Sequence, residues 1–224
     1  MAGYNINDIV RDVRICLDEN DVQNAFMQLE ENTLMLDDII KSKVGEAIDG
    51  VVISAPVELL GDGDVMPIDN VEWENGAGDE DELKMCRVKK PADYLRLVGA
   101  KMPDWDHAVS EVIAENSEEY KMQKSRFVGM RGNPQRPVVA DVLSGAGRYL
   151  ELYTSKARSI DYIRYIKRLS TAELGDNIML PAALYKVVIY QVAGLTCITL
   201  NETERAQTLF GIAEGLLDSS KKEE

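Results

Sequence analysis

Apolar residues recur at helical spacing near both ends of this chain, and the pattern is missing from the middle. They occupy one stripe in residues 6–17, another in residues 36–51, and two more in residues 184–217. Spacing of three and four residues is typical of amphipathic helices, which bury their apolar stripe against another element. We therefore expect the terminal helices to pack on one another, with the middle of the chain as an insert.

Short runs rich in Val, Leu and Tyr fill the middle and alternate in part, which is typical of strands. SGAGR separates two of them and predicts a hairpin of residues 137–143 with residues 148–154. Residues 105–125 fit a strand or a helix. The predicted fold class is α+β: N- and C-terminal helices packed as a helical bundle, with a mainly antiparallel β insert.

This pattern divides the chain into three parts. Residues 1–60 and 175–224 are predicted to form the helical domain. Residues 61–82, rich in Gly and Asp, are predicted to be an acidic loop in which VEW is at most a short strand. Residues 83–174 are predicted to form the mainly β domain.

Capping residues and a proline predict the limits of the first two helices. Asn5 or Asn7 is expected to cap the first helix, which ends near residue 19. Pro56 is expected to end the second helix at about Ser54, because the residue before a proline is pushed out of the helical region. The apolar residues 51–53 therefore form the buried end of that helix or an extended piece leaving it.

The C-terminal helices carry similar signals. Asp176 or Asn177 is expected to cap the third helix, with Pro181 in its first turn. Thr203 or Asn201 is expected to cap the fourth helix. Residues 178–200 are the longest apolar stretch, but polar residues interrupt it, so we expect a buried core helix and not a membrane span.

Charge is unevenly distributed along the chain. The net charge is −14, yet residues 58–82 contain ten acids and no Lys or Arg, while residues 121–168 contain eleven basic residues and three acids. Such an acidic chain is disfavoured as a general nucleic-acid binder, because nucleic-acid affinity depends on neutralising phosphates. Opposite charges on one chain can instead pair between copies. Two solvated faces that never meet are the alternative.

No arrangement of residues predicts catalysis or a metal site. The single histidine, His107, has Asp104 and Asp106 beside it, so an acid–base dyad is conceivable, but a polar position at the start of an element is the simpler interpretation. The three cysteines are far apart and lack CxxC spacing, which argues against zinc and disulfides. We expect no enzyme activity, no cofactor and no metal.

Five parts of the chain together resemble one family. They are IVRDVRICLDEN, LDDIIKSKVGEAIDGVVISAPVELL, KKPADYLRLVGAKMPDW, the pair RPVVADVL and RYLELYTS, and LPAALYKVVIYQVAGLTCITLNETERAQTLFGIAEGLL. In this order they resemble the opening helix, the second helix ending in Ala-Pro, a Leu-Pro-x-Asp-Phe-Leu-Arg-Leu strand, a hairpin and the C-terminal helix pair of neck proteins in crAss-like tailed phages of Bacteroides. Lys90 and Tyr94 stand where that strand usually has Leu and Phe, which weakens this motif.

The resemblance covers most of the chain apart from the acidic loop, and the order of the motifs carries it. It implies a head–tail connector (adaptor) protein, a structural protein of the virion neck that is assembled in the host cytoplasm. Identical subunits would form a closed ring, a dodecamer to match a portal. The portal and other neck or tail proteins would be its partners, and DNA would pass through the lumen without being read.

A ring needs two different contact faces on each subunit, and the sequence offers candidates for them. The charged candidates for the subunit interface are Glu74, Asp79, Glu80, Asp81, Glu82, Arg126, Arg131 and Arg136. The apolar candidates, which exceed what one small domain needs, are Val52, Ile53, Leu59 and Leu60. The alternative function is a regulatory or adaptor binding module without catalytic activity, which holds a partner peptide or nucleic acid.

Overall fold

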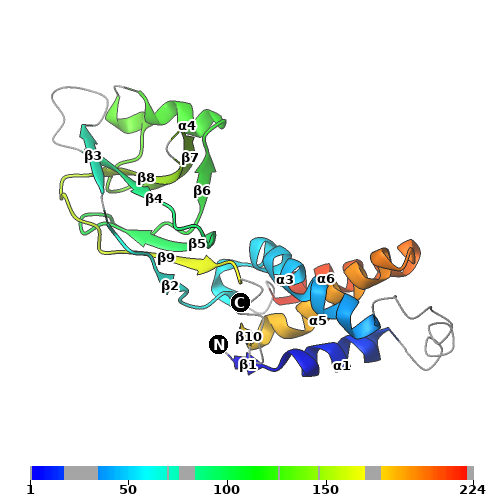
Figure 1. The fold of residues 1–224 in the computed structure, drawn as a ribbon. Helices are drawn as coiled ribbons and strands as arrows, with labels where there is room; N and C mark the ends of the chain where they lie inside the picture. The colour runs from blue at the N-terminus through cyan, green and yellow to red at the C-terminus, as the bar shows by residue number, and fades with distance from the viewer. Residues whose placement is uncertain are drawn as a thin grey trace. The chain divides into compact units, whose positions relative to one another are not determined.

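The first and last parts of the chain fold together, and the middle folds on itself (Figure 1). The computed structural model describes residues 2–17, 35–69, 71–75, 84–125, 127–145, 147–169 and 178–220. One unit, called here the helical unit, comprises Met1–Gly61 and Arg168–Glu224, and the other, the sheet unit, comprises Asp62–Lys167. The fold class is α+β with antiparallel-rich sheets, as predicted.

The helical unit is organised around one apolar helix. Helix α5 (Ala182–Thr199) contacts α1 (Ile6–Cys16), α3 (Leu36–Ser54) and α6 (Thr203–Ser220). In the described part of the chain α5 alone is long and apolar enough to cross a membrane, and 50% of it is buried inside the protein. The core helix of a soluble protein has the same composition. A bundle arrangement of the four helices stays a prediction.

Local signals place the ends of the first two helices. The Asn5 side chain accepts a hydrogen bond from the Asn7 backbone N–H at 2.8 Å, which satisfies one of the unpaired donors at the start of α1. Helix α3 ends at Ser54, and Ala55 before Pro56 is extended, with φ −66° and ψ 147°. The one-turn helix η1 (Val57–Leu59) follows. The end of the second helix predicted at Ser54 is therefore confirmed, and residues 51–53 form the last turn of that helix.

The predicted start of the third helix is wrong, because residues before Pro181 form a strand. Strand β10 (Ile178–Leu180) pairs antiparallel with β1 (Ala2–Tyr4), and α5 begins only at Ala182. Pro181 is the N-cap residue and not part of the first turn. The three residues of β10 form hydrogen bonds with residues at the opposite end of the chain, and a local sequence pattern cannot predict such a distant partner.

The predicted cap of the fourth helix is also wrong. Asn201 has a left-handed backbone (φ 64°) and ends α5, where the Asn201 N–H bonds to Ile198 O at 3.0 Å and the Glu202 N–H bonds to Cys197 O at 2.8 Å. These two bonds make a Schellman motif, in which Asn takes the place usually held by glycine. Thr203 is already helical, and the Ala206 N–H bonds to Glu202 O, so Glu202 holds the capping position.

The described strands of the sheet unit form two sheets. The larger has the order β3-β4-β8-β7-β6, with β3 (Glu72–Asn75), β4 (Lys84–Lys89), β8 (Gly147–Ser155), β7 (Val138–Ser144) and β6 (Val112–Ala114). All its pairs are antiparallel except β6 with β7. The smaller sheet has the antiparallel order β2-β9-β5, with β2 (Asp64–Val65), β9 (Tyr162–Lys167) and β5 (Tyr94–Lys101).

Side-chain alternation builds the sheet unit in layers. Cys86, Val88, Leu150 and Leu152 of the larger sheet share a core with residues of the smaller sheet, such as Ile163. The opposite face of the larger sheet packs in a second core against Tyr120 of α4 (Glu118–Gln123). The order of layers is therefore smaller sheet, main core, larger sheet, second core and α4 (Figure 1).

Several strand predictions can be compared directly with this arrangement. The hairpin is confirmed, with Leu143 opposite Arg148 in the register of β7 and β8. Residues 105–125, for which a strand and a helix were both open, contain β6 and then α4. The acidic segment was expected as a loop with VEW as at most a short strand. In its described part it contains the short strand β3, in which Trp73 packs partly against the main core, and also β2, which pairs with β9.

The two residues that depart from the strand motif of the resembling family are neighbours. The ammonium of Lys90 lies 4.1 Å from the centre of the Tyr94 ring. Lys90 is buried and pairs with Asp141 of β7, and burial lowers the pKa of its ammonium. A buried lysine needs a partner for its charge, and here it has both a carboxylate and an aromatic ring.

Candidate functional site

The face of the larger sheet beneath α4 carries charged residues among its apolar ones. In β4 and β8, Arg87 and Glu151 alternate with side chains of the main core, so they point toward α4. Met85 and Tyr153 lie on the same face and belong to the second core. Because α4 covers this face of the sheet, the carboxylate of Glu151 is buried, whereas on an uncovered sheet it would be exposed to water.

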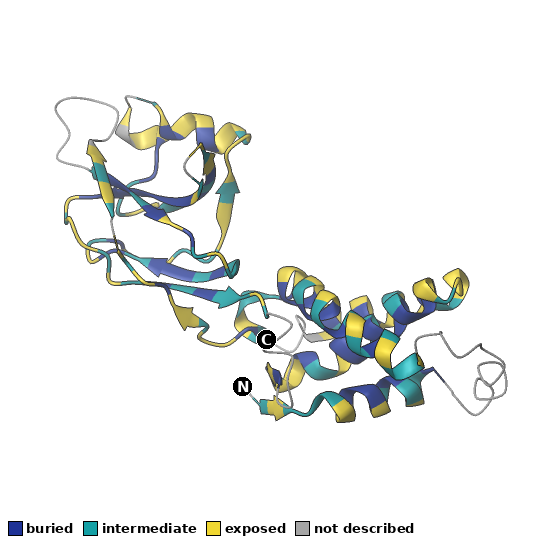
Figure 2. Ribbon diagram, in the orientation of Figure 1, coloured by how far each residue is buried: buried dark blue, intermediate teal, exposed yellow. Residues whose placement is uncertain are grey.

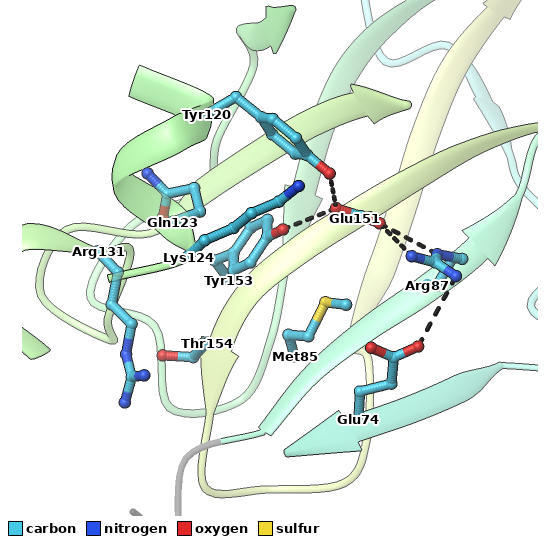
Figure 3. A pocket seen from close by; sticks show the side chains of 10 residues that line it. All are labelled: Glu74, Met85, Arg87, Tyr120, Gln123, Lys124, Arg131, Glu151, Tyr153 and Thr154. Atoms are coloured by element: carbon cyan, nitrogen blue, oxygen red, sulfur yellow. Dashed lines mark hydrogen bonds and ion pairs between the residues drawn. The ribbon is translucent and has the colours of Figure 1, made fainter. Parts of the chain in front are cut away.

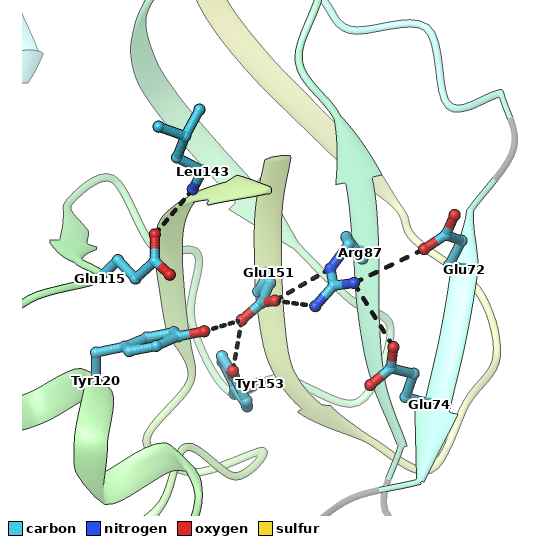
Figure 4. A network of polar contacts seen from close by, with 8 residues as sticks. All are labelled: Glu72, Glu74, Arg87, Glu115, Tyr120, Leu143, Glu151 and Tyr153. Carbon is cyan, nitrogen blue, oxygen red and sulfur yellow. Dashed lines mark hydrogen bonds and ion pairs between the residues drawn. The ribbon is translucent and has the colours of Figure 1, made fainter. Parts of the chain in front are cut away.

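Glu151 is buried and accepts hydrogen bonds on both carboxylate oxygens (Figure 4). Its Oε1 accepts from Arg87 Nη2 at 2.5 Å and from Arg87 Nε at 3.1 Å. Its Oε2 accepts from the hydroxyls of Tyr153 at 2.6 Å and Tyr120 at 3.0 Å. The guanidinium of Arg87 also lies 3.7 Å from a carboxylate oxygen of Glu74 and 3.9 Å from one of Glu72.

This network is satisfied within one subunit. Hydrogen bonding to Glu151 raises the pKa of Arg87. Burial, together with the hydrogen bond to Glu151, raises the pKa of Tyr120 to about 12 and also raises the pKa of Tyr153. Neither tyrosine is thus available as an acid or base near neutral pH. A buried carboxylate that accepts four hydrogen bonds stabilises a fixed geometry of the side chains around it.

A close backbone approach positions the loop after α4. A Cβ atom on Gly132 would lie only 2.8 Å from Tyr153 Cβ, so glycine is required there. The Gly132 N–H donates to Gln123 Oε1 at 2.6 Å, and its carbonyl accepts from Thr154 Oγ1 at 2.8 Å. These contacts hold the neighbouring Arg131 at the rim of the same face.

A hollow of about 270 Å³ opens between α4, this loop and the larger sheet (Figure 3). The residues that line it are Glu74, Met85, Arg87, Tyr120, Gln123, Lys124, Arg131, Glu151, Tyr153 and Thr154. Three of them are cations and two are acids. The ammonium of Lys124 lies over the Tyr120 ring, 5.1 Å from its centre. The hollow therefore combines positive charge with aromatic walls.

The segment beside the hollow exposes large apolar side chains. Met122 of α4 is 45% exposed, Phe127 is 57% exposed, and Met130 of the short helix η2 (Val128–Met130) is 53% exposed. Figure 2 shows α4 with mostly exposed residues on its outer side. We call Met122, Lys124, Phe127 and Met130 the α4–η2 surface. Clustered exposed apolar side chains mark interaction sites more often than scattered ones do.

Only one of the acidic candidates for the subunit interface, Glu74, lies among the described residues. Glu74 is exposed at the edge of the hollow, and its carboxylate lies 3.7 Å from the guanidinium of Arg87 in the same chain. Asp79, Glu80, Asp81 and Glu82 lie outside the described residues, as does Arg126 of the basic candidates. Their predicted role in a subunit interface stays a prediction.

The described basic candidates differ in exposure. Arg136 is exposed. Arg131 is only 3% exposed, and its Nη1 donates to Ser125 O at 3.5 Å, so it offers little surface to another subunit except through the hollow. The burial of Arg131 could not be predicted from the sequence, because a single arginine in a loop is usually exposed.

The apolar candidates separate into core and surface. Val52 is 4% exposed and Leu60 is 1% exposed, so both are core residues of a single subunit. Ile53 is 57% exposed and Leu59 is partly exposed, which leaves these two for an interface. The apolar residues at the end of α3 and around η1 are therefore divided evenly between core and surface.

Sequence reasoning missed Glu151, Tyr120, Tyr153 and Lys124. Glu151 lies between two leucines in RYLELYT, a pattern that predicts an exposed acid on a half-buried strand. The only available signal was that β4, β7 and β8 each carry apolar residues on both faces. That signal indicates a sheet covered on both sides, but it does not identify the covering element.

No catalytic or metal-binding arrangement is found in the described residues. No group of three or more His, Cys, Asp and Glu side chains there could hold a metal ion. His107 is exposed, and Asp104 accepts hydrogen bonds from Ser155 Oγ at 2.5 Å and Lys156 N at 2.8 Å. The chemistry that the site supports is recognition of an anionic, partly apolar group. In comparisons with known proteins, no family model and no curated protein matches this chain.

Proposed function

We propose that this chain is a structural virion protein that forms a ring in the neck of a phage, joins the portal to the tail and lets DNA pass. The observation that carries the proposal is the sheet unit, which has two exposed surfaces of different charge. Asp64 and Asp69 are exposed on and after β2 of the smaller sheet, while the α4–η2 surface, which carries Lys124 among apolar side chains, is exposed on the side of the larger sheet that α4 covers. Figure 1 shows β2 and α4 at different ends of this unit.

Two unlike faces on one subunit are what a closed ring requires. A heterologous contact joins one face of a subunit to a different face of the next, and the ring closes when the rotation allows it. Complementary charge on the two faces gives such a contact its register and its partner choice. The proposed partners are further copies of the chain in a dodecamer, the portal and other neck or tail proteins.

The overall charge agrees with DNA passing through such a ring without being bound. A net charge of −14 repels the duplex. DNA in the lumen would therefore slide along a negative wall. The resemblance of the chain to neck proteins supports the same role.

The experiment is assembly of the purified protein with and without a portal ring. We expect weak self-association of the protein alone, measured by mass photometry, and closed rings on the portal, seen by negative-stain electron microscopy. Rings with the portal absent would also support the proposal. A chain that stays monomeric with portal present, and fails to bind it, contradicts the proposal.

The hollow favours a second candidate, an adaptor or regulatory binding module without catalytic activity. Its cations and aromatic walls suit a peptide or an anionic ligand. Electrophoretic mobility shift with short DNA at low salt distinguishes the two functions, because tight DNA binding would favour the second. Neck function predicts no stable shift.

A further inference from the structure

The hollow has one cation, Lys124, that neither of its own acids pairs with. Of its two carboxylates, Glu151 already accepts four hydrogen bonds, and Glu74 approaches Arg87 only at 3.7 Å. Among the described residues Lys124 has no carboxylate within ion-pair distance, and its ammonium contacts only the face of the Tyr120 ring. A ligand with a negative charge would complete the hollow.

The size and rim of the hollow favour an amino-acid side chain. A water molecule takes about 30 Å³ of liquid, so a hollow of about 270 Å³ has room for one acidic side chain and its hydration. The exposed Phe127 and Met130 belong to the loop between Lys124 and Arg131, two residues that line the hollow, and would contact an apolar neighbour of that acid. Nucleic acid is disfavoured, because its affinity requires many phosphate contacts.

The sheet unit also contains a segment with exposed carboxylates that could pair with Lys124 of another copy. Asp64 and Val65 form β2, where Asp64 is exposed and the Val65 side chain is 67% exposed. Among the described residues no Lys or Arg lies within ion-pair distance of Asp64 or Asp69, whereas Asp62 already pairs with Arg164 at 3.0 Å. Consecutive side chains of a strand point to opposite faces, so Asp64 presents its carboxylate on one side of β2 and Val65 lies on the other. The carboxylate of Asp64 is therefore free to meet a cation of another copy.

The geometry points to a contact between copies in which residues 61–69 of one chain dock at the hollow and the α4–η2 surface of the next. In this contact the carboxylate of Asp64 pairs with the ammonium of Lys124. The contact joins two different faces, so it repeats from copy to copy in one direction. This inference rests on the proposed ring, and it names the residues that would hold the ring together.

A peptide with the sequence of residues 61–69, GDGDVMPID, tests the hollow in the full-length chain. Fluorescence anisotropy of the labelled peptide measures its affinity. Because like charges facing each other oppose binding, we expect Lys124→Glu to weaken binding by about tenfold or more. The peptide with Asn in place of Asp64 and Asp69 should lose affinity similarly. Lys89→Glu, an exposed lysine of β4 that does not line the hollow, is the matched control and should bind normally.

A charge exchange tests the contact between whole chains. Lys124→Glu and Asp64→Lys should each reduce self-association in sedimentation velocity, and the double variant should restore it, because the exchanged charges again attract. Circular dichroism checks that the variants are folded. Equal peptide binding by the wild type and Lys124→Glu, no saturable binding at all, or displacement of the peptide by submillimolar inorganic phosphate would overturn the assignment.

These outcomes are separable from those of the proposed function. Rings that form on the portal although the peptide does not bind would leave neck function intact and refute this contact. Peptide binding that depends on Lys124, in a chain that never assembles on a portal, would support the contact and refute the neck role.

Discussion

Replacement of Arg87 by methionine is expected to destabilise the sheet unit strongly. Methionine keeps much of the apolar length of the side chain and removes the guanidinium, so the carboxylate of Glu151 loses two hydrogen bonds and its counter-charge. The Glu151 side chain is only 1% exposed, so water cannot replace these partners. A buried charge without its partner is costly because its desolvation is no longer offset.

The expected magnitude follows from the burial of both partners. Breaking a buried ion pair by removing one member costs about 3 to 5 kcal/mol. The Arg87 side chain is 25% exposed, so part of the pair is screened by solvent. We therefore expect the lower end, about 3 kcal/mol of unfolding free energy. Glu151→Gln, which removes the charge but keeps an acceptor for the two tyrosine hydroxyls, should cost about half as much.

The assay is urea unfolding followed by tryptophan fluorescence. The chain has two tryptophans, Trp73 and Trp105, and both belong to the sheet unit. Their signal isolates this unit, whereas circular dichroism would mix two unfolding transitions. Arg148→Met, an exposed arginine of the neighbouring strand β8, is the matched control and should change stability by at most about 0.5 kcal/mol.

A double-mutant cycle decides whether the cost arises from the pair. Arg87→Met combined with Glu151→Gln should cost less than the sum of the two single variants, by about 2 kcal/mol, because the lone charge is gone. Additive costs would show that Arg87 and Glu151 act independently. A cost for Arg87→Met no larger than that of the Arg148→Met control would refute the reasoning altogether.

Two further predictions concern helix packing and pH. Gly194→Ala should lower the stability of the helical unit by about 1 to 3 kcal/mol, because the new Cβ would lie 2.4 Å from Phe210 Cε1. Gly215→Ala in α6 meets nothing within 4 Å and should stabilise this unit by up to about 1 kcal/mol. Both are measured by thermal unfolding at 222 nm, where the long helices, all of which belong to this unit, dominate the signal. Equal effects of the two substitutions would contradict the close approach. The pKa of Tyr120 is raised from an ordinary 10.0 to about 12, which means that folding favours the neutral phenol. Its contribution to the free energy of unfolding is therefore complete below pH 10.0 and is lost as the pH rises toward about 12. Urea midpoints from about pH 9 to about pH 12 should therefore fall less steeply for Tyr120→Phe than for the wild type, and identical slopes would count against it.

Local chemistry in the sequence determined much of the fold. Side-chain periodicity predicted the bodies of α1, α3, α5 and α6, and SGAGR predicted the hairpin of β7 and β8. Pro56 determined the end of α3. Each of these features depends on neighbours within a few residues, since helical spacing, caps and turns are properties of short segments.

Contacts between distant segments decided the rest. Strand β10 exists because β1 pairs with it from the other end of the chain. Strand β9 follows the β7–β8 hairpin in the sequence but pairs with β5 and β2 in the other sheet. The same holds for the candidate site. Glu151 is buried only because α4 covers the outer face of its sheet, and Lys124 reaches the hollow only from the end of that helix. A sequence pattern records which side of a strand a residue occupies, whereas its burial depends on which surface folds over that side, and this is set by packing between segments far apart in the chain.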